Sequence, residues 1–403
     1  MEILKIFIPF AFGYFLSYLM RVVNAVIAPN LVVELELTAA DLGLLTSANF
    51  LAFSAAQLPL GVLLDRFGPR LIEALLLLFA ASGAFLFANA QSMPELITGR
   101  ALIGLGTSAC LMGAFKAYLM WVPSKKIPLI NGLQMTAGGL GAVTGTVPME
   151  LALTITDWRG LFVGFGFIAI FISLIIYLAV PQQSETNRTI SSLTDQFGGL
   201  VKIYTNPIFW RIAPITIASQ SMFLGTQSLW AGPWLSDVAG LDRDVVAHYL
   251  LIIAIAMVGG FLGMGTVANQ LEKWGIKTIT VSIGGMIIFA LIQLPIIFLW
   301  IDLALPLWIA FGFFGTAGIL SYASLPLYFP SEMAGRVITA LNVFTFGGAF
   351  AAQWGMGLII NLWPNYDIVG SYDPSGYQAA FALMLAIQLA GLAWFFFFRK
   401  TKV

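Results

Sequence analysis

The stretch GVLLDRFGPR, residues 61–70, places one aspartate and two arginines between two apolar runs. These runs, residues 42–63 and 71–90, are each long enough to cross a bilayer, which takes ~20 mostly apolar residues. The stretch is therefore predicted to be a short loop at a membrane surface. The whole chain agrees, because 59% of its 403 residues are hydrophobic and 9% are charged, against roughly 25% in soluble proteins. So few charges could not cover a water-exposed surface.

The apolar sequence predicts an all-α membrane protein with twelve transmembrane helices in two groups of six. The predicted helices cover residues 4–28, 42–63, 71–90, 94–121, 128–152, 160–180, 209–235, 246–269, 278–300, 305–328, 337–362 and 377–398. Residues 1–180 and 209–403 then form two six-helix bundles, and the polar residues 181–208 form a cytoplasmic linker. The N-terminal apolar run continues past any small-residue cleavage site, so it is predicted to be a helix rather than a cleaved signal.

The basic residues predict the orientation, because cytoplasmic segments are enriched in lysine and arginine. With the N-terminus inside, only Arg159 and Arg243 fall on the outer side. The cytoplasmic basic residues are Lys5, Arg66, Arg70, Lys125, Lys126, Arg188, Lys202, Arg211, Lys273, Lys277, Arg336, Arg399, Lys400 and Lys402. Both termini are therefore predicted to be cytoplasmic, in a bacterial-type inner (plasma) membrane.

The polar loop resembles a signature of the major facilitator superfamily, G-x-x-x-D-R-x-G-R-R, which lies between the second and third helices of that family. The matching positions are Gly61, Asp65, Arg66, Gly68 and Arg70, with Pro69 where a basic residue is usual. RALIGLG, starting at Arg100, is similar to the family's R-x-x-x-G-x-G pattern in the fourth helix. The resemblance implies two pseudo-symmetric bundles that transport a solute by alternating access.

The same resemblance implies a role for the loop: its residues latch the two halves in the outward-open state. The alternative is that Arg66 and Arg70 only fix the topology. In the second half Asn269 replaces the acid, so a latch there is expected to be weaker.

Three basic residues fall inside predicted helices, namely Arg21, Arg100 and Lys116. Charges are costly in the bilayer and usually functional there. Arg21 and Arg100 both lie ~9–12 Å below the outer boundary, so they are expected to face one cavity. Arg21 is the predicted anchor for an anion, and the alternative is that it binds helix carbonyls or extends to the surface. For Arg100 the family resemblance implies a structural or proton-coupling role, and the alternative is that it contacts the substrate as a second positive group. Lys116 is expected to extend to the cytoplasmic surface.

YLMRVVNAVIAP, starting at Tyr18, is similar to the first helix of the family's organic-anion and organophosphate branch. That resemblance implies that Arg21 contacts phosphate or carboxylate. Asn24 and Tyr18 flank Arg21 at helical spacing, and Thr107 shares a helix face with Arg100. The second half contributes polar residues that are expected to line the opposite wall, with hydrogen bonding between helices as the alternative. They are Gln220, Gln227, Tyr249, Tyr322 and Asn342.

The predicted function is therefore transport of a small organic anion, a carboxylate or a phosphorylated metabolite. Acidic residues lie near the helix ends, with Glu73 one turn into the third helix and Glu150 at the outer rim. This leaves symport, exchange and uniport open, with a proton or a counter-ion as possible partner. The alternatives are a proton-coupled exporter of drugs or other cationic or amphipathic solutes, a lipid translocator, and a membrane sensor. Residues 128–152 lack the Gly-Pro pair of drug antiporters, and their glycines are predicted to pack helices closely.

Other functional classes find no support in the sequence. The zero formal net charge, without a basic run, predicts no nucleic-acid partner. Cys110 and His248 are each the single residue of their kind, so no disulfide, Cys/His metal site or Cys-His nucleophile is expected. No cofactor and no enzymatic activity are predicted. The expected partners are a small-molecule substrate and the lipid bilayer, with the protein acting as a monomer.

Overall fold

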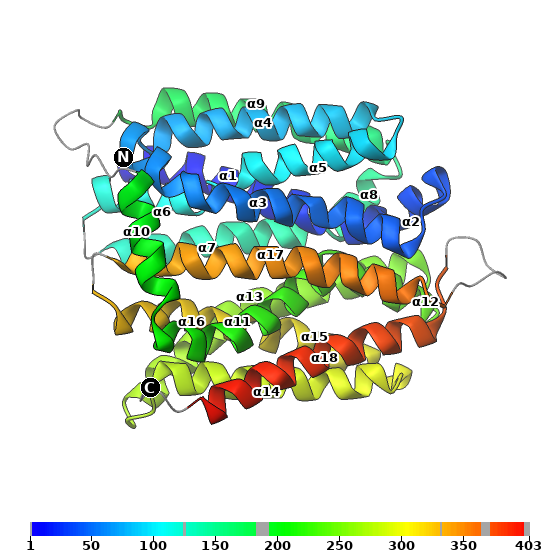
Figure 1. Ribbon diagram of the computed structural model, residues 1–403. Coiled ribbons are helices and arrows are strands. Elements are labelled where there is room, and N and C mark those ends of the chain that lie inside the picture. The colour runs from blue at the N-terminus through cyan, green and yellow to red at the C-terminus, as the bar shows by residue number, and fades with distance from the viewer. Residues whose placement is uncertain (1, 124–125, 183–192, 331–332, 364–370, 399–403) are drawn as a thin grey trace. The chain divides into compact units, whose positions relative to one another are not determined.

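The computed structural model of the chain describes residues 2–123, 126–182, 193–330, 333–363 and 371–398, and the side chains of all of these except residues 2, 128 and 193–197. The described residues form helices, turns and loops without strands (Figure 1). Residues 183–192 of the predicted linker, and the basic residues Lys125, Arg188, Arg399, Lys400 and Lys402, lie outside the described part. The prediction of an all-helical protein is confirmed.

The chain divides into two compact units, each built from two stretches of sequence. The N-unit comprises Met1–Asn24 and Ala48–Gln196, and the C-unit comprises Ala25–Ser47 and Phe197–Val403. The chain therefore enters the C-unit just after Asn24 and returns to the N-unit at Ala48. The sequence had suggested two contiguous bundles, whereas here residues 25–47 pack with the second unit.

The N-unit contains most of the helices of the first half. They are α1 (Glu2–Val22), the greater part of α3 (Ala39–Phe67), α4 (Pro69–Asn89), α5 (Met93–Thr107), α6 (Met112–Trp121), α7 (Ile127–Thr144), α8 (Val147–Ala152) and α9 (Trp158–Ala179). The helix α4 packs against α5 and α9, and α1 packs against α7. Gly68 precedes α4 with a φ of 81°, a conformation that favours glycine, and Pro69 occupies the first turn.

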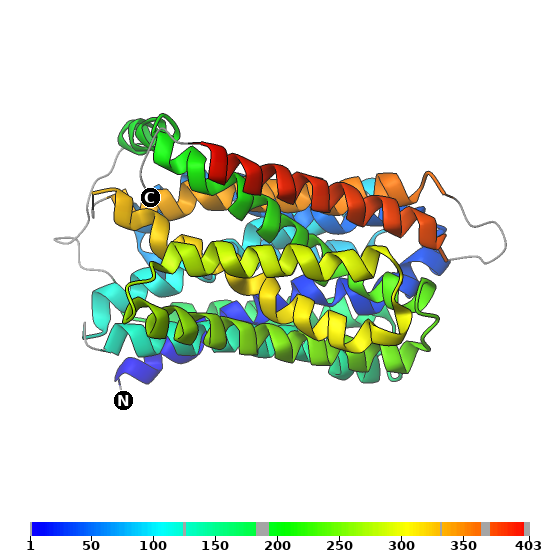
Figure 2. The same cartoon turned by 90° about the horizontal axis from the view of Figure 1, so that it is seen from below.

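The C-unit contains the remaining helices, with two exceptions at helix starts. They are α2 (Asn24–Leu35), α10 (Leu193–Tyr204), α11 (Pro207–Gly225), η3 (Thr226–Trp230), α12 (Ala231–Asp237), α13 (Arg243–Glu272), α14 (Thr278–Ile297), η4 (Ile301–Leu303), α15 (Ala304–Phe314), η5 (Gly315–Gly318), α16 (Ile319–Ser324), η6 (Leu325–Tyr328), α17 (Ala334–Ile360) and α18 (Pro374–Phe397). The exceptions are Asn24 of α2 and residues 193–196 of α10, which belong to the N-unit. The helix α15 packs against α13 and α14 (Figure 2), and α11 packs against α17 and α18.

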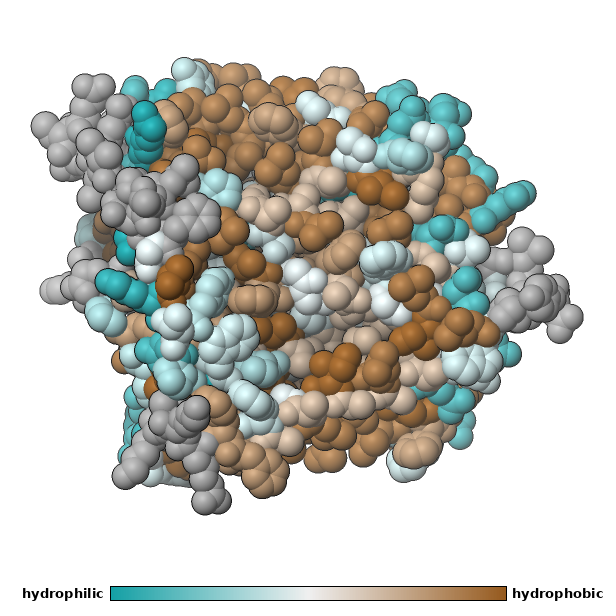
Figure 3. All heavy atoms as spheres, viewed as in Figure 1, coloured by the Kyte–Doolittle hydropathy of each residue, from teal (hydrophilic) through white to brown (hydrophobic). Residues whose placement is uncertain are grey.

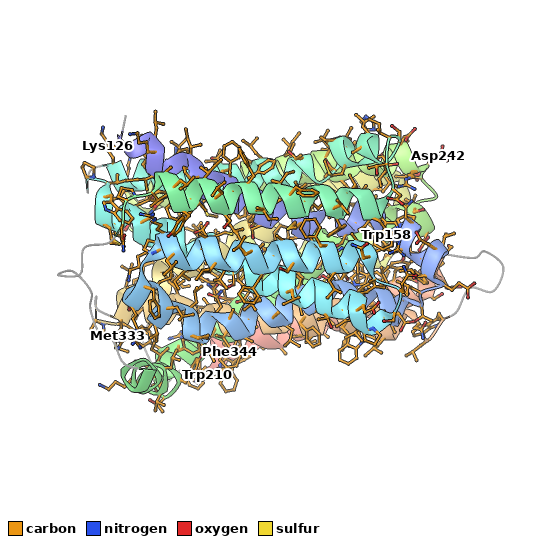
Figure 4. All side chains as sticks on the ribbon, turned by 90° about the horizontal axis from the view of Figure 1, so that it is seen from above. Lys126, Trp158, Trp210, Asp242, Met333 and Phe344 are labelled. Atoms are coloured by element: carbon orange, nitrogen blue, oxygen red, sulfur yellow. The ribbon has the colours of Figure 1, made fainter. Side chains whose placement is uncertain are left out.

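Helix α10 lies in the segment that the sequence suggested as a linker. Its Tyr204 hydroxyl donates to the Ala340 carbonyl at 3.3 Å. The rings of Trp210 and Phe344, which are 5.6 Å apart, lie at the same end of the C-unit as α10 (Figure 4). Tyr204 of α10 packs against both of these rings, so the linker ends in a helix that is attached to the C-unit by aromatic contacts.

Ten helical segments within the described residues are long and apolar enough to cross a membrane. The two predicted spans missing from these ten are 128–152, which the structure divides into α7 and α8, and 209–235, which it divides into α11, η3 and α12. The face seen in Figure 3 carries hydrophobic residues over its middle and hydrophilic residues toward its ends. Large apolar side chains such as Leu119, Phe167 and Leu178 are exposed. The chain is an all-helical, multi-span membrane protein.

Candidate functional site

The first predicted span is broken, which the sequence did not anticipate. The helix α1 ends at Val22, and α2 begins at Asn24. The Asn24 side chain donates from Nδ2 to the Arg21 carbonyl at 3.0 Å, and such local bonds compete with helical ones. Arg100 donates from Nη1 to the Met20 carbonyl at 3.2 Å. Two polar side chains thus satisfy carbonyl groups that the end of a helix exposes.

Arg21 lies at this break and is held by aromatic rings. Its side chain is 6% exposed. The guanidinium carbon lies 4.9 Å from the ring centre of Tyr18, 5.3 Å from Phe53 and 5.9 Å from Phe50. Rings at these distances stabilise a cation without neutralising it. The predicted proximity of Tyr18 to Arg21 is therefore present, and Tyr18 in turn packs edge-on against Tyr14 at 5.2 Å.

Arg100 is placed differently, although it reaches the same break. Its side chain has no exposed surface. The guanidinium carbon lies 4.3 Å from the ring centre of Phe87 and 4.7 Å from that of Phe162. Its one hydrogen bond goes to the Met20 carbonyl, while Nε and Nη2 find no hydrogen-bond partner among the described residues. These contacts tie α5 to the end of α1.

Helix α7 packs against α1, and glycines of α7 lie at this contact. A methyl group on Gly138 would overlap the rings of Tyr14 and Tyr18, and one on Gly141 would overlap the Phe15 carbonyl. The prediction that these glycines pack helices closely is confirmed. They allow α1 to carry the bulky side chains around Arg21 while remaining in contact with α7.

Other predicted residues of the N-unit have local roles. The Thr107 hydroxyl, which is buried, donates to the Ile103 carbonyl of its own helix at 2.9 Å. Gly104 in the RALIGLG stretch contacts the Asn49 backbone, where a side chain would not fit. Glu150 lies half-buried in α8.

The polar residues predicted in the C-unit make hydrogen bonds between its helices. Gln220 donates to the Gly315 carbonyl at 2.8 Å, and Gln227 donates to the Met257 sulfur at 3.2 Å. The Tyr322 hydroxyl donates to the Thr345 hydroxyl at 2.8 Å. For these three residues the structure shows the interhelical bonding that the sequence left as the alternative. Asn342 is 8% exposed and Tyr249 is half-buried.

The segment that carries Gln220 and Gln227 is not one regular α-helix. Gln227 lies in η3, a π-helical turn. The wider turn changes the angle between the two side chains. A neighbouring network joins Gln353 to residues that the sequence did not single out. Ser228 donates to Gln353 Oε1 at 2.8 Å, and the Gln353 amide donates to the Thr46 hydroxyl. The Trp230 ring donates to the Gln353 carbonyl at 2.9 Å. Thr46 and Ser228 carry no sequence signal beyond being small and polar.

The residues of the signature loop lie together at one end of the N-unit. Asp65 forms an ion pair with Lys116 of α6. Lys116 was expected to extend to the surface, and the structure shows its amine bound to a carboxylate of the same unit. Arg66 lies over the Phe67 ring at 5.3 Å, and Arg70 lies over the Tyr177 ring at 4.8 Å.

A small pocket opens beside this loop. It measures about 140 Å³, and Gly68, Arg70, Trp121 and Tyr177 are among its lining residues. Gly61 lies half-buried in α3, one turn before Asp65. No group of three or more histidine, cysteine, aspartate or glutamate side chains is placed to hold a metal ion in the part of the chain that the structure describes.

The family model of the Major Facilitator Superfamily matches residues 10–353. An uncharacterized transporter of Bacillus subtilis, YybO, is 26% identical over 92% of this chain and 89% of its own length. The probable L-galactonate transporter of Escherichia coli K12 is 24% identical over 66% of this chain and 62% of its own length, which is less than two thirds of that relative.

Among solved structures, a bacterial homologue of the human lysosomal transporter Spinster, in an inward-facing and occupied conformation, superposes with a TM-score of 0.76. The match covers 98% of this chain and 96% of the other, at 16% sequence identity. At this identity the similarity establishes the fold alone.

Proposed function

Because the chain belongs to the Major Facilitator Superfamily, we propose that it carries a small organic anion across the membrane, with Arg21 as the anchor for a carboxylate or phosphate group. The protein is a multi-pass membrane transporter and not an enzyme. The bacterial relatives support a plasma-membrane location. The proposal therefore concerns two points, namely that the substrate is an anion and that Arg21 binds it.

The single observation that carries the proposal is the setting of Arg21. A cation that is 6% exposed, next to three aromatic rings, sits where an anion would gain far more than in water, since Coulomb interactions strengthen as the effective dielectric falls. A guanidinium also matches the planar geometry of a carboxylate with two parallel hydrogen bonds. Arg100 is assigned a different role, because its rings and its bond to Met20 position the end of α1 that carries Arg21.

The relatives support the anionic substrate class. The name of the L-galactonate transporter refers to a sugar acid, and its carboxylate is the kind of group that an arginine binds. With 24% identity over part of the chain, this similarity supports the class rather than the individual substrate.

We further propose twelve membrane crossings with both termini in the cytoplasm. The residues of α7 with α8, and those of α11 through α12, each exceed the ~20 that a crossing needs. Within the N-unit, Lys126 and Trp158 lie at opposite ends of the helices, and within the C-unit so do Trp210 and Asp242 (Figure 4). The chain therefore runs the full length of each unit between these residues, which supports two more crossings in addition to the ten.

A ligand-dependent stability measurement tests the proposal, because a ligand of the native state raises its stability. The thermal midpoint of the purified protein is measured with L-galactonate, other sugar acids and sugar phosphates, with neutral galactose as the control solute. Anions of the right size are expected to raise the midpoint in a concentration-dependent way, and galactose is not.

The variant Arg21→Gln is expected to weaken anion binding by roughly ten- to a hundredfold, since a hydrogen bond to a charged group contributes about 1.5–3 kcal/mol. Arg21→Lys should also bind poorly, because an ammonium lacks the planar fork. Arg243→Gln, which removes an exposed arginine of the C-unit, is the control and should bind as the wild type does. Unchanged affinity in Arg21→Gln, or equal stabilisation by galactose, would rule out the anchor.

A further inference from the structure

Glu73 is a buried carboxylic acid that takes no part in the proposed anion site. It lies in the second turn of α4, and none of its side chain is exposed. Neither carboxyl oxygen has a hydrogen-bond partner among the described residues. Buried acids are normally paired or hydrogen-bonded, so a carboxyl in this setting calls for an explanation.

Two glycines form the walls around this carboxyl. A methyl group on Gly13 of α1 would lie 2.6 Å from Oε1, and one on Gly113 of α6 would lie 2.5 Å from Oε2. Larger residues at either position would displace the acid. The carboxyl is therefore enclosed by helix backbone on two sides, and the Cys110 thiol is the polar side chain that touches it.

The charged groups of the N-unit are engaged elsewhere. Lys116 pairs with Asp65, Arg70 lies over Tyr177, and Arg100 lies between two phenylalanine rings. On α1, Arg21 lies over Tyr18, and it also interacts electrostatically with Cys110 and Tyr14. On α9, the Ser173 hydroxyl donates to the Ala74 carbonyl of α4 at 2.7 Å and does not titrate.

The titratable neighbours of Glu73 are weak acids. Cys110 touches it from the turn between α5 and α6, and Tyr118 faces it from α6. The Tyr118 hydroxyl already donates to Gln134 at 2.7 Å. Tyr14 of α1 interacts with Cys110 in turn. Among the residues that the structure describes, no lysine or arginine forms an ion pair with Glu73. An uncompensated buried charge is costly, so this setting favours the neutral acid.

The fourth predicted span is interrupted next to Glu73. The helix α5 ends at Thr107 and α6 begins at Met112, and Cys110 lies in the turn between them. Interrupted helices are where transporters of several folds place their ion sites. Glu73 is about 6 Å along the helix axis from Pro69, and Pro69 lines the pocket at the end of the unit. Water that entered from that end would need to advance about one helical turn.

We propose that Glu73 is a proton-binding site that couples transport to a proton. The neutral acid is the form enclosed by Gly13 and Gly113. When α1 or α6 moves away, water reaches the carboxyl, the O–H bond breaks, the proton passes to water and the carboxylate remains. The reverse step binds the proton again before the site closes. The coupling of proton binding to transport rests on the proposed transport function, whereas proton binding at Glu73 does not.

Infrared spectroscopy of the purified protein in liposomes, without any substrate, tests the proton site. The carbonyl band of a protonated carboxylic acid is expected to disappear with rising pH and to shift in heavy water. Glu73→Gln should lack this band. Glu272→Gln, which removes an exposed carboxylate at the end of α13, should retain it. If Glu73→Gln does not fold, Glu73→Met replaces it with an apolar chain of similar length.

The coupling is tested with L-galactonate and the other anions of the panel in proteoliposomes. Glu73→Gln should retain exchange of anion across the membrane and lose accumulation driven by a pH gradient. A wild-type protein without a titrating carboxylic acid band, or a Glu73 variant that keeps the band, overturns the proton site. A titrating band that depends on Glu73 in a protein that moves none of the anions supports the proton site and contradicts the proposed function instead.

Discussion

Arg21 and Arg100 show how two arginines of the N-unit differ in role. Both guanidinium groups are stabilised by aromatic rings. Arg100 has no exposed surface and bonds a carbonyl of α1, so its removal leaves that carbonyl without its partner. Arg21 is slightly exposed and lies at the break itself. One arginine therefore supports the structure, and the other is assigned to the substrate.

Arg100→Met is expected to lower the free energy of unfolding, because an unsatisfied buried carbonyl costs about 1–3 kcal/mol. Arg21→Gln is expected to change stability much less than it changes anion binding. The thermal midpoints of the two variants without ligand measure this difference. If Arg100→Met were as stable as the wild type, the bond to Met20 would contribute nothing to the end of α1.

At the scale of elements, α1 and α7 pack closely because glycines face the contact. Gly138 and Gly141 of α7 lie against Tyr14, Tyr18 and Phe15 of α1. Gly132, in the same helix, has open space beside it. Within one helix, then, some glycines are required by packing and another is not.

Gly141→Ala is expected to destabilise the N-unit, because the added methyl group overlaps the Phe15 carbonyl and overpacking costs about 1–3 kcal/mol. Gly132→Ala is the matched control. It should be neutral or stabilising by about 0.5–1 kcal/mol, since alanine favours the helix. Thermal unfolding of both variants provides the comparison, and equal effects would contradict the assigned contact.

At the scale of the whole molecule, the two compact units do not follow the order of the sequence. Residues 25–47, which run from the end of the first predicted span to the start of the second, pack with the C-unit. The break at Val23 lies next to this boundary. The contacts of Arg100 and Asn24 at the break therefore act where the chain passes from one unit to the other.

The proposed topology predicts which residues a membrane-impermeant thiol reagent reaches in intact cells. In a Cys110→Ala background, Thr154→Cys and Asp242→Cys should be labelled, because they follow the α7–α8 and α11–α12 crossings. Lys126→Cys and Lys273→Cys should be labelled only after the cells are opened. Protection of Thr154→Cys or Asp242→Cys in intact cells would mean that the corresponding segment does not cross.

The sequence by itself determined the class of the protein, because hydrophobic composition and span length depend on the membrane rather than on neighbouring helices. It also singled out Arg21, since a charge within an apolar helix is visible without a structure. Only the tertiary structure decided the partners: Lys116 for Asp65, the Met20 carbonyl for Arg100, and glycine walls for Glu73. Such contacts join helices that are far apart in the chain, and helical periodicity specifies the face of a residue but not what packs against it.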